Sequence, residues 1–281
     1  MFSKLYTQTI SDLAKCYNTH ADKFSSTRKK HWPEMERVID RVKKREEDQE
    51  IKKTILELGC GDGRLYSHLI EQKTKIDKYT GVDISSELIQ KAKKNHPDDN
   101  NIRRVIDDMI GYLQSCDNES VDIIVCMASF QHIPDKESRN KLLQEIYRVM
   151  RYGGKFVSID RSWSYWMLRT HRKAFLKSLW KYIISLWWRE RSNLLIPFRS
   201  NNKNKIEEKN LRLYHIFMRS ELKNILTEQW FVIEDMIYSS QSGEFHHKRQ
   251  QARNICTCVR KDIFVNSDRD TKVIENLISD K

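Results

Sequence analysis

A glycine-rich turn stands where one strand is expected to end and a helix to begin. Residues 54–58 form a short apolar run, Gly59, Gly61 and Gly63 alternate directly after it, and a helical pattern starts at Arg64. Glycines allow a tight turn and let backbone N–H groups approach a ligand without a Cβ in the way. The N-terminus of the following helix favours a nearby negative group. This turn is therefore a candidate binding site for a ligand that carries a carboxylate.

Acidic residues lie at or beside the ends of successive expected strands. Glu57 lies near the end of the first, Asp83 closes the second, 20 residues after Gly63, and Asp107 and Asp108 follow the third. Sheets of this kind bind ligands outside the carboxyl ends of their strands, where an acid can reach ribose hydroxyls. One aspartate alone would be interpreted as a helix cap or turn residue, but the whole set predicts a ligand site. The Gly-x-Gly-x-Gly spacing differs from the dinucleotide pattern, which disfavours a nicotinamide cofactor.

Alternating strand and helix patterns predict a parallel sheet with helices on both faces, an α/β, doubly wound and Rossmann-like fold. We expect Ser85 to cap one helix and Gly153-Gly154 to end another. The expected strands are 54–58, 78–83, 102–106, 121–126, 155–160, 231–238 and 254–260, and the expected helices are 64–72, 85–95, 136–150 and 220–229.

The turn and the acids belong to a longer series of motifs. In chain order, the motifs are Glu57-Leu-Gly-Cys-Gly-Asp-Gly63, Gly81-Val-Asp83, Asp108 and Arg151-Tyr-Gly-Gly-Lys155. In order and spacing they resemble the motifs of class I S-adenosylmethionine-dependent methyltransferases, over about residues 50–160 and the closing strands. The resemblance implies S-adenosyl-L-methionine as cofactor and a seven-stranded sheet whose last strand is antiparallel.

The resemblance also assigns residues to parts of the cofactor. It implies Glu57, Gly59, Gly61 and Gly63 around the methionine part, Asp83 on the ribose, and Asp108 with Met109 near the adenine. Ile84 and Met127 complete the expected cofactor-binding set, and no metal is expected.

Three further segments are similar to the tRNA methyltransferases that esterify a carboxymethyl group on the wobble uridine of the anticodon. They are Tyr17-Asn-Thr-His-Ala-Asp-Lys-Phe-Ser-Ser-Thr-Arg28 with Trp32-Pro33, Met127-Ala-Ser-Phe-Gln-His132 with Ser138-Arg139, and the segment from Leu211 through Tyr214-His215 and Arg219 to Leu222. With them the similarity covers most of the chain. It implies tRNA as a partner and, for some enzymes of that kind, a small activator protein.

Methylation of a carboxylate is an in-line displacement by an oxygen that is already anionic, so alignment matters more than a strong base. Arg28 or Arg219 could orient such a carboxylate through a bidentate contact. His132 or His215 could line the pocket, and a hydrogen-bonded structural role is the alternative for each. These four are the candidate substrate-positioning residues.

The expected organisation has five parts. Residues 1–50 form an N-terminal helical cap, 51–160 the cofactor-binding core, 161–219 a basic, aromatic-rich helical insert or lid, 220–263 the rest of the core sheet, and 264–281 a polar tail. The insert holds fourteen Lys and Arg against three Glu, a surplus of 11 in a chain whose net charge is +12. Its charge and aromatics fit tRNA contact, a packed lid with helical spacing at 176–187, a membrane-surface helix, or a solvated basic face.

Three classes of function compete. An RNA-modifying methyltransferase leads, a methyltransferase acting on a lipid, quinone or other small molecule is the enzymatic alternative, and a binding partner that retains the fold is the third. Intact glycines and Asp83 argue against the third.

The expected cellular compartment depends on two signals that are not seen in the sequence. There is no apolar run of ~18 residues for a membrane span and no visible secretory signal, so we expect a cytoplasmic protein with reduced thiols. Cys256-x-Cys258 lies near His246-His247, which raises the idea of a metal site, but we expect the two cysteines to pack in the core.

Overall fold

The computed structural model describes residues 3–27, 32–43, 53–170, 172, 192–198 and 211–262. Three expectations fall outside these ranges: the role of Arg28, the helical spacing at 176–187 and the polar tail at 264–281. They stay predictions.

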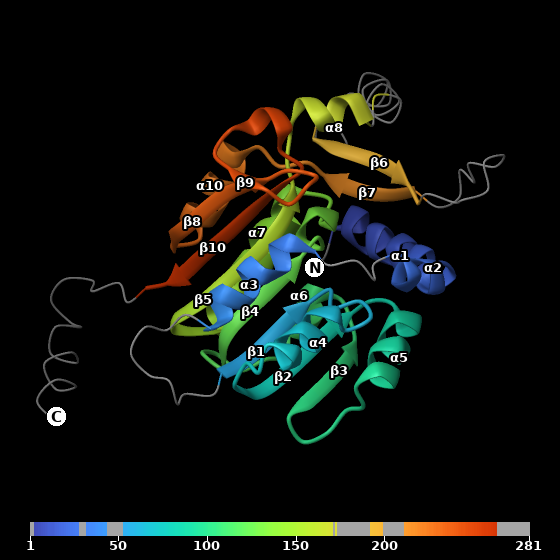
Figure 1. Cartoon of the computed structure of the whole chain (residues 1–281), viewed down its shortest axis with the longest axis vertical. Helices are drawn as coiled ribbons and strands as arrows, with labels where there is room; N and C mark the ends of the chain where they lie inside the picture. Colours follow the sequence, from blue (N-terminus) through green and yellow to red (C-terminus); the bar gives the residue numbers. More distant parts are fainter. Residues whose placement is uncertain are drawn as a thin grey trace, which may run out of the picture.

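A sheet of eight strands forms the centre of the described structure, in the order β3-β2-β1-β4-β5-β10-β8-β9 (Figure 1). Its members are β1 (Lys53–Leu58), β2 (Ile76–Asp83), β3 (Ile102–Ile106), β4 (Val121–Met127), β5 (Met150–Arg161), β8 (Phe231–Ser239), β9 (Phe245–His246) and β10 (Asn254–Lys261). The five strands from β3 to β5 pair in parallel, whereas β10 is antiparallel to both β5 and β8. Because the strand order reverses between β1 and β4, their carboxyl ends flank the crevice where such sheets bind ligands.

The strand count corrects one expectation. Seven expected strands are present, and an eighth, β9, pairs with the end of β8 through Tyr238 and Ser239. No strand was expected there, because a strand of two residues carries no periodic signal.

A second correction concerns Gly153-Gly154. Helix α7 (Lys136–Val149) ends before these glycines, which lie inside β5. A Cβ on Gly154 would lie 2.7 Å from the carbonyl oxygen of Arg151 and 2.9 Å from that of Asp122. The β4–β5 pairing is irregular at this point, so the glycines serve a close backbone approach in a strand rather than a helix end.

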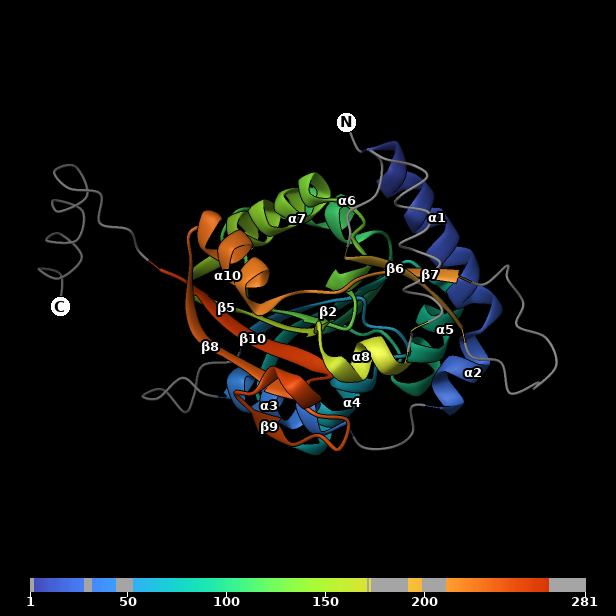
Figure 2. The same ribbon diagram turned by 90° about the horizontal axis from the view of Figure 1, so that it is seen from above.

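Helices cover both faces of the sheet (Figure 2). One face carries α6 (Met109–Gln114), α7 and α10 (Arg219–Glu228), and the other carries α3 (Pro33–Lys43) and α4 (Arg64–Glu71). Helix α5 (Ser86–Asn95) packs against β2 and β3. Ser85 caps α5 by accepting the Leu88 N–H at 3.2 Å, as expected. Helix α3 buries Val38, Ile39 and Val42, the stripe expected of an amphipathic helix.

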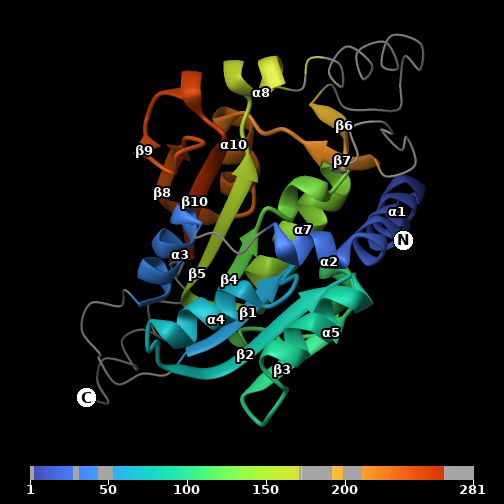
Figure 3. The same cartoon turned by 45° about the vertical axis from the view of Figure 1, so that its right-hand side comes forward.

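The N-terminal helices lie across the carboxyl ends of the parallel strands. Figure 3 shows α1 (Lys4–Thr19) and α2 (Ala21–Ser26) beside α5 and near the strand β7 (Leu211–His215). In this region Tyr6 donates to Asp108 at 2.6 Å, and Ser85 donates to Asn18 at 2.7 Å. These hydrogen bonds fix α1 over the ends of β2 and β3.

The described part of the insert is partly β-structure. Helix α8 (Tyr165–Thr170) precedes a two-stranded antiparallel sheet of β6 (Asn193–Pro197) and β7 (Leu211–His215). Met167, Leu194, Ile196, Tyr214 and Ile216 form its apolar cluster. The expectation of a helical insert is therefore wrong for the strand pair, because the dense basic and aromatic residues obscured the short alternating runs.

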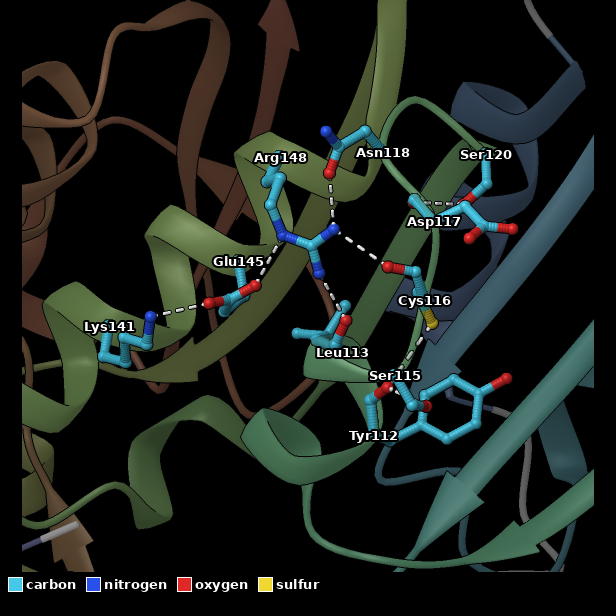
Figure 4. A network of polar contacts seen from close by, with 10 residues as sticks. All are labelled: Tyr112, Leu113, Ser115, Cys116, Asp117, Asn118, Ser120, Lys141, Glu145 and Arg148. Carbon is cyan, nitrogen blue, oxygen red and sulfur yellow. Dashed lines mark hydrogen bonds and ion pairs between the residues drawn. The ribbon is translucent and has the colours of Figure 1, made fainter. Parts of the chain in front are cut away.

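Arg148 on α7 fixes the connection that leads into β4 (Figure 4). Its Nη2 donates to the Leu113 carbonyl at 2.7 Å, and its Nη1 donates to the Cys116 carbonyl at 2.8 Å. Nη1 also bonds Asn118 Oδ1 at 2.7 Å, and Nε bonds Glu145 at 2.7 Å. The guanidinium therefore satisfies carbonyl groups at the end of α6. Through that contact α7 positions β4, and with it the short helix η1 (Phe130–His132) that follows.

Candidate functional site

A cavity of about 330 Å³ lies at the carboxyl ends of the parallel strands. The part around the glycine turn, here called the glycine end, is lined by Glu57, Gly59, Gly61, Asp83, Ile84, Asp107, Met109 and Met127. The other part, here called the arginine end, is lined by Tyr17, Gln131, His132, Arg161, Tyr214, Arg253 and Asn254. Ile10, Leu13 and Phe24 of the N-terminal helices also line the cavity.

Asp83 organises the glycine turn from the end of β2. Its Oδ2 accepts the Gly61 N–H at 2.8 Å, and its Oδ1 accepts the Ser85 N–H at 2.9 Å. The Val82 carbonyl accepts the Gly59 N–H at 2.7 Å. Burial raises the pKa of Asp83 to about 6, and the donating N–H groups oppose that shift. The carboxyl group is therefore held in one orientation at the cavity wall.

The turn depends on residues without a Cβ. Gly59 has φ +78°, and a Cβ there would lie 2.1 Å from Ser129 Oγ. Gly61 has φ +57°, and its Cβ would meet Phe24 at 3.3 Å. Gly63, at φ +80°, does not line the cavity and instead packs against α5. The result is a main-chain cradle before the N-terminus of α4, which suits a ligand carboxylate.

Glu57 is a buried acid beside this cradle. It is 4% exposed and accepts a hydrogen bond from the Tyr79 hydroxyl. Burial raises the pKa of Glu57 to about 8, and the Tyr79 hydrogen bond and the charge of Arg64 oppose the shift. A buried carboxyl of this kind gains most from a cationic group on a bound ligand.

Asp108 was expected near the adenine, and its carboxylate has other partners. Its Oδ1 accepts the N–H groups of Ile110 and Gly111, each at 3.0 Å, and so caps α6. The Tyr6 hydroxyl also donates to Oδ1. Its neighbours Asp107 and Met109 line the cavity, and Asp108 does not.

His132 contributes a neutral ring to the arginine end. Its Nδ1 lies 2.6 Å from the Leu213 carbonyl, which can only accept, so Nδ1 carries the proton. Nε2 therefore accepts from the Tyr17 hydroxyl at 3.1 Å. Burial lowers the pKa of His132 to about 3, and the positive charges of Arg212 and Arg161 act in the same direction. Both ring nitrogens are thus engaged in hydrogen bonds.

Two other expected substrate residues, His215 and Arg219, do not line this cavity. His215 is 1% exposed, and its ring bonds Asn193 Oδ1 at 2.8 Å and Glu221 Oε1 at 2.7 Å. Arg219 lies at the start of α10 with its guanidinium 5.9 Å from the ring of Tyr238. Neither lines the cavity, and Arg28 lies outside the described residues. Of the four candidates, the structure places His132 in the cavity lining.

Several residues of the arginine end escaped the sequence analysis. Arg161 is the last residue of β5, so the strand-end reasoning applied to Asp83 would have found it. Arg253 immediately precedes β10 and reaches the cavity because that strand runs antiparallel beside β5. No local signal marks it. Tyr17 and Tyr214 belong to the segments that resemble the tRNA enzymes, yet their chemistry was left unassigned.

Comparison with known proteins decides the nature of the core. Residues 55–154 match the model of a family described as a methyltransferase domain. This core is a methyltransferase domain. The glycine end fits S-adenosylmethionine, the cofactor expected from the sequence: the cradle suits its carboxylate, and Glu57 suits its ammonium.

One curated relative resembles less than half of this chain. The ubiquinone biosynthesis O-methyltransferase of Actinobacillus pleuropneumoniae serotype 5b (strain L20) is 28% identical over 123 residues, 41% of this chain and 50% of that protein. The chain thus spans about half the length of this relative.

Two solved structures share the fold over most of both chains. The 1,6-didemethyltoxoflavin-N1-methyltransferase of Burkholderia thailandensis, with 1,6-didemethyltoxoflavin and S-adenosylhomocysteine bound, has a TM-score of 0.59 at 14% identity, covering 94% of this chain and 92% of its own. A methyltransferase from the Haloferax volcanii complex with the Trm112 methyltransferase activator has a TM-score of 0.58 at 15% identity, covering 89% and 97%.

Proposed function

We propose that this chain transfers the methyl group of S-adenosylmethionine to a carboxylate oxygen, and that the acceptor is a carboxymethylated wobble uridine of tRNA. The observation that carries this proposal is the state of His132. A neutral ring with both nitrogens hydrogen-bonded is poorly suited to remove a proton. An acceptor that is already anionic needs no such step.

The chemistry follows from the nature of the two reactants. Bound S-adenosylmethionine supplies a methyl group on a positively charged sulfur. A carboxylate oxygen forms the new O–C bond as the S–C bond breaks and its electron pair moves to sulfur, so no proton is transferred. The protein's part is to align the oxygen, exclude water and hold the acceptor still.

The convergence of three distant segments supports a tRNA acceptor. Tyr17, His132 and Tyr214 each belong to one of the segments similar to the wobble-uridine methyltransferases, and all three line the arginine end. Trp32 and Pro33, from the same resemblance, line the cavity as well. The surplus of basic residues in 161–219 is compatible with contacts to phosphate groups.

A partner protein is suggested by the same resemblance. The Haloferax volcanii neighbour is a methyltransferase solved with a Trm112 activator, and we propose that a small activator protein could serve this chain as well. Within the described ranges no helix combines the length and apolarity needed to cross a bilayer.

A small-molecule acceptor is the second candidate. It is favoured by Ile10, Leu13 and Phe24, which give the cavity an apolar roof, and by the named substrate pathway of the Actinobacillus relative. A lipid or quinone would fit such a roof.

The deciding experiment offers labelled S-adenosylmethionine and two pools of acceptor, total small RNA and an RNA-free extract. Gly61→Arg protein is the control, because a side chain there fills the cradle. Nucleoside mass spectrometry should find the label as a methyl ester of a carboxymethylated uridine. Label confined to the RNA-free pool would replace this proposal with the small-molecule one.

A further inference from the structure

Arg161 brings a guanidinium group into the cavity that holds the cofactor-binding turn. It is the last residue of β5, and its main-chain N–H donates to Gln131 Oε1 at 2.8 Å. Its Nη1 donates to Asn254 Oδ1 at 3.1 Å. Both partners also line the cavity. The side chain is therefore anchored by one edge, and its Nε and Nη2 groups have no hydrogen-bond partner among the described residues.

Positive charge accumulates around this group. Burial and the positive charges of Arg253 and Arg212 lower the pKa of Arg161 to about 10, whereas Tyr214 and Glu34 act in the opposite direction. Glu34 already accepts hydrogen bonds from Ser239 at 2.7 Å and Asn254 at 2.6 Å. Within the described ranges no carboxylate forms an ion pair with Arg161.

Such an arrangement costs folding free energy, because a cation withdrawn from water near other cations is disfavoured. Proteins keep unfavourable groups of this kind where a ligand supplies the missing charge. The location of Arg161 agrees with such a role, since Arg161 ends β5 at the cavity and His132 follows the neighbouring strand β4 there.

We propose that Arg161, with Arg253 beside it, binds the carboxylate of the methyl acceptor and so selects acceptors that carry that charge. This inference rests on the proposed carboxylate methylation. One carboxylate oxygen accepts from the free edge of the guanidinium, and the other stays available for the methyl group. Arg161 is then a substrate-binding residue that orients the acceptor without activating it.

The test compares two RNA hairpins that differ in one group. One carries 5-carboxymethyluridine at the wobble position, and the other carries the neutral 5-carbamoylmethyluridine. Affinities are measured with the full chain in the presence of S-adenosylhomocysteine. The variants are Arg161→Gln, Arg161→Lys and, as a matched control, Arg151→Gln at the opposite end of the same strand, where the side chain is 46% exposed and paired with Asp122.

Wild-type protein should prefer the charged hairpin by roughly tenfold or more, the size expected for hydrogen bonds to a charged group. Arg161→Gln should remove that preference while leaving affinity for the neutral hairpin unchanged. Arg161→Lys should keep part of it, and Arg151→Gln should keep all of it. The melting temperature of Arg161→Gln should equal or exceed that of the wild type, which an arginine kept only for structure would not allow.

A second probe separates this inference from the tRNA proposal. Acetate should raise the melting temperature of wild-type and Arg151→Gln protein more than acetamide does, and this difference should vanish in Arg161→Gln. If acetate behaves so but neither hairpin binds, the tRNA acceptor is wrong and the carboxylate site stands. If Arg161→Gln keeps the preference for the charged hairpin, loses affinity for both hairpins equally, or keeps the acetate response, Arg161 does not bind the acceptor's carboxylate.

Discussion

The glycine end of the cavity takes its shape from the main chain between Glu57 and Ile84, whereas the arginine end is made by side chains that range from Tyr17 to Asn254. At the glycine end, Asp83 bonds backbone N–H groups of its own neighbourhood, and glycine conformation sets the contour. At the arginine end, Tyr17 meets His132, and Arg161 meets Asn254.

The difference bears on how each end can vary. A main-chain cradle depends on few side chains, so it can serve one cofactor in enzymes with unrelated acceptors. An end made of converging side chains can be remodelled by single substitutions. The relative and the structural neighbour are named for different reactions, ubiquinone biosynthesis O-methylation and 1,6-didemethyltoxoflavin N1-methylation.

The largest effect is expected from a methyl group in the cradle. Gly59→Ala should abolish measurable methyl transfer and weaken S-adenosylhomocysteine binding at least about a hundredfold, because the Cβ would lie 2.1 Å from Ser129 Oγ in a left-handed backbone. Gly61→Ala meets Phe24 at 3.3 Å and should lose only about tenfold. Calorimetric titration checks both, and equal losses would show that the cradle is not defined by close backbone contact.

The two ends should respond oppositely to pH. The folded-state pKa of Glu57, about 8, lies above its usual 4.5, so the stability it contributes is present at acid pH and lost as pH rises through 8. The folded-state pKa of His132, about 3, lies below 6.5, so its contribution is present above pH 6.5 and lost as pH falls.

Two neutral substitutions test this contrast. Relative to wild type, Glu57→Gln should gain at least about 1 kcal/mol in free energy of unfolding between pH 6 and 9, because it cannot ionise. His132→Gln should gain a similar amount between pH 7 and 5. Denaturant titrations across this pH range provide the measurement. Curves that stay parallel to the wild type would mean that these groups do not set the pH dependence.

Adjacent aspartates should separate binding from stability. Asp108→Ala removes the cap of α6 and the partner of Tyr6, so the free energy of unfolding should fall by about 1–2 kcal/mol with cofactor affinity unchanged. Asp107→Ala should leave the free energy of unfolding unchanged and weaken cofactor binding by roughly tenfold. Thermal unfolding and cofactor titration on both variants decide which aspartate contacts the cofactor. A cofactor defect in Asp108→Ala alone would support the expected place of Asp108 near the adenine.

The smallest effect is expected at Tyr17. Tyr17→Phe leaves His132 Nε2 without its donor and Arg212 without its acceptor. We expect KM for the acceptor to rise by roughly fivefold, about 1 kcal/mol, with cofactor affinity unchanged. Steady-state kinetics with both substrates varied gives the split, and a change in cofactor affinity alone would place Tyr17 with the glycine end.

Sequence reasoning reached most of the glycine end because its signals are local. The turn, Asp83 and the cap at Ser85 lie within short windows where spacing reports backbone geometry. The sequence does not show which of Asp107 and Asp108 lines the cavity, because both follow the same strand and their side chains diverge only once α6 and Tyr6 are in place.

The arginine end resisted prediction for a tertiary reason. His215 belongs to a Tyr-His pair that looked suited to a pocket, but Asn193 and Glu221 hold its ring away from the cavity. Arg253 joins Arg161 only because β10 lies antiparallel beside β5. The doubly wound sheet and its seven longer strands were predicted, whereas the eighth strand and the strand pair in the insert were too short to leave a pattern.

Glu34 has a consequence for how the chain matures during synthesis. Its carboxylate bonds Ser239 and Asn254, which leave the ribosome more than 200 residues later. Gly243 closes on the neighbouring Pro33, where a Cβ would lie 2.3 Å from the proline ring. Until those late residues arrive, α3 can pack its apolar stripe on the earlier strands, but the Glu34 carboxylate lacks these two partners. The arginine end, which is lined by Arg253 and Asn254, is thus completed only after the glycine turn has been synthesised.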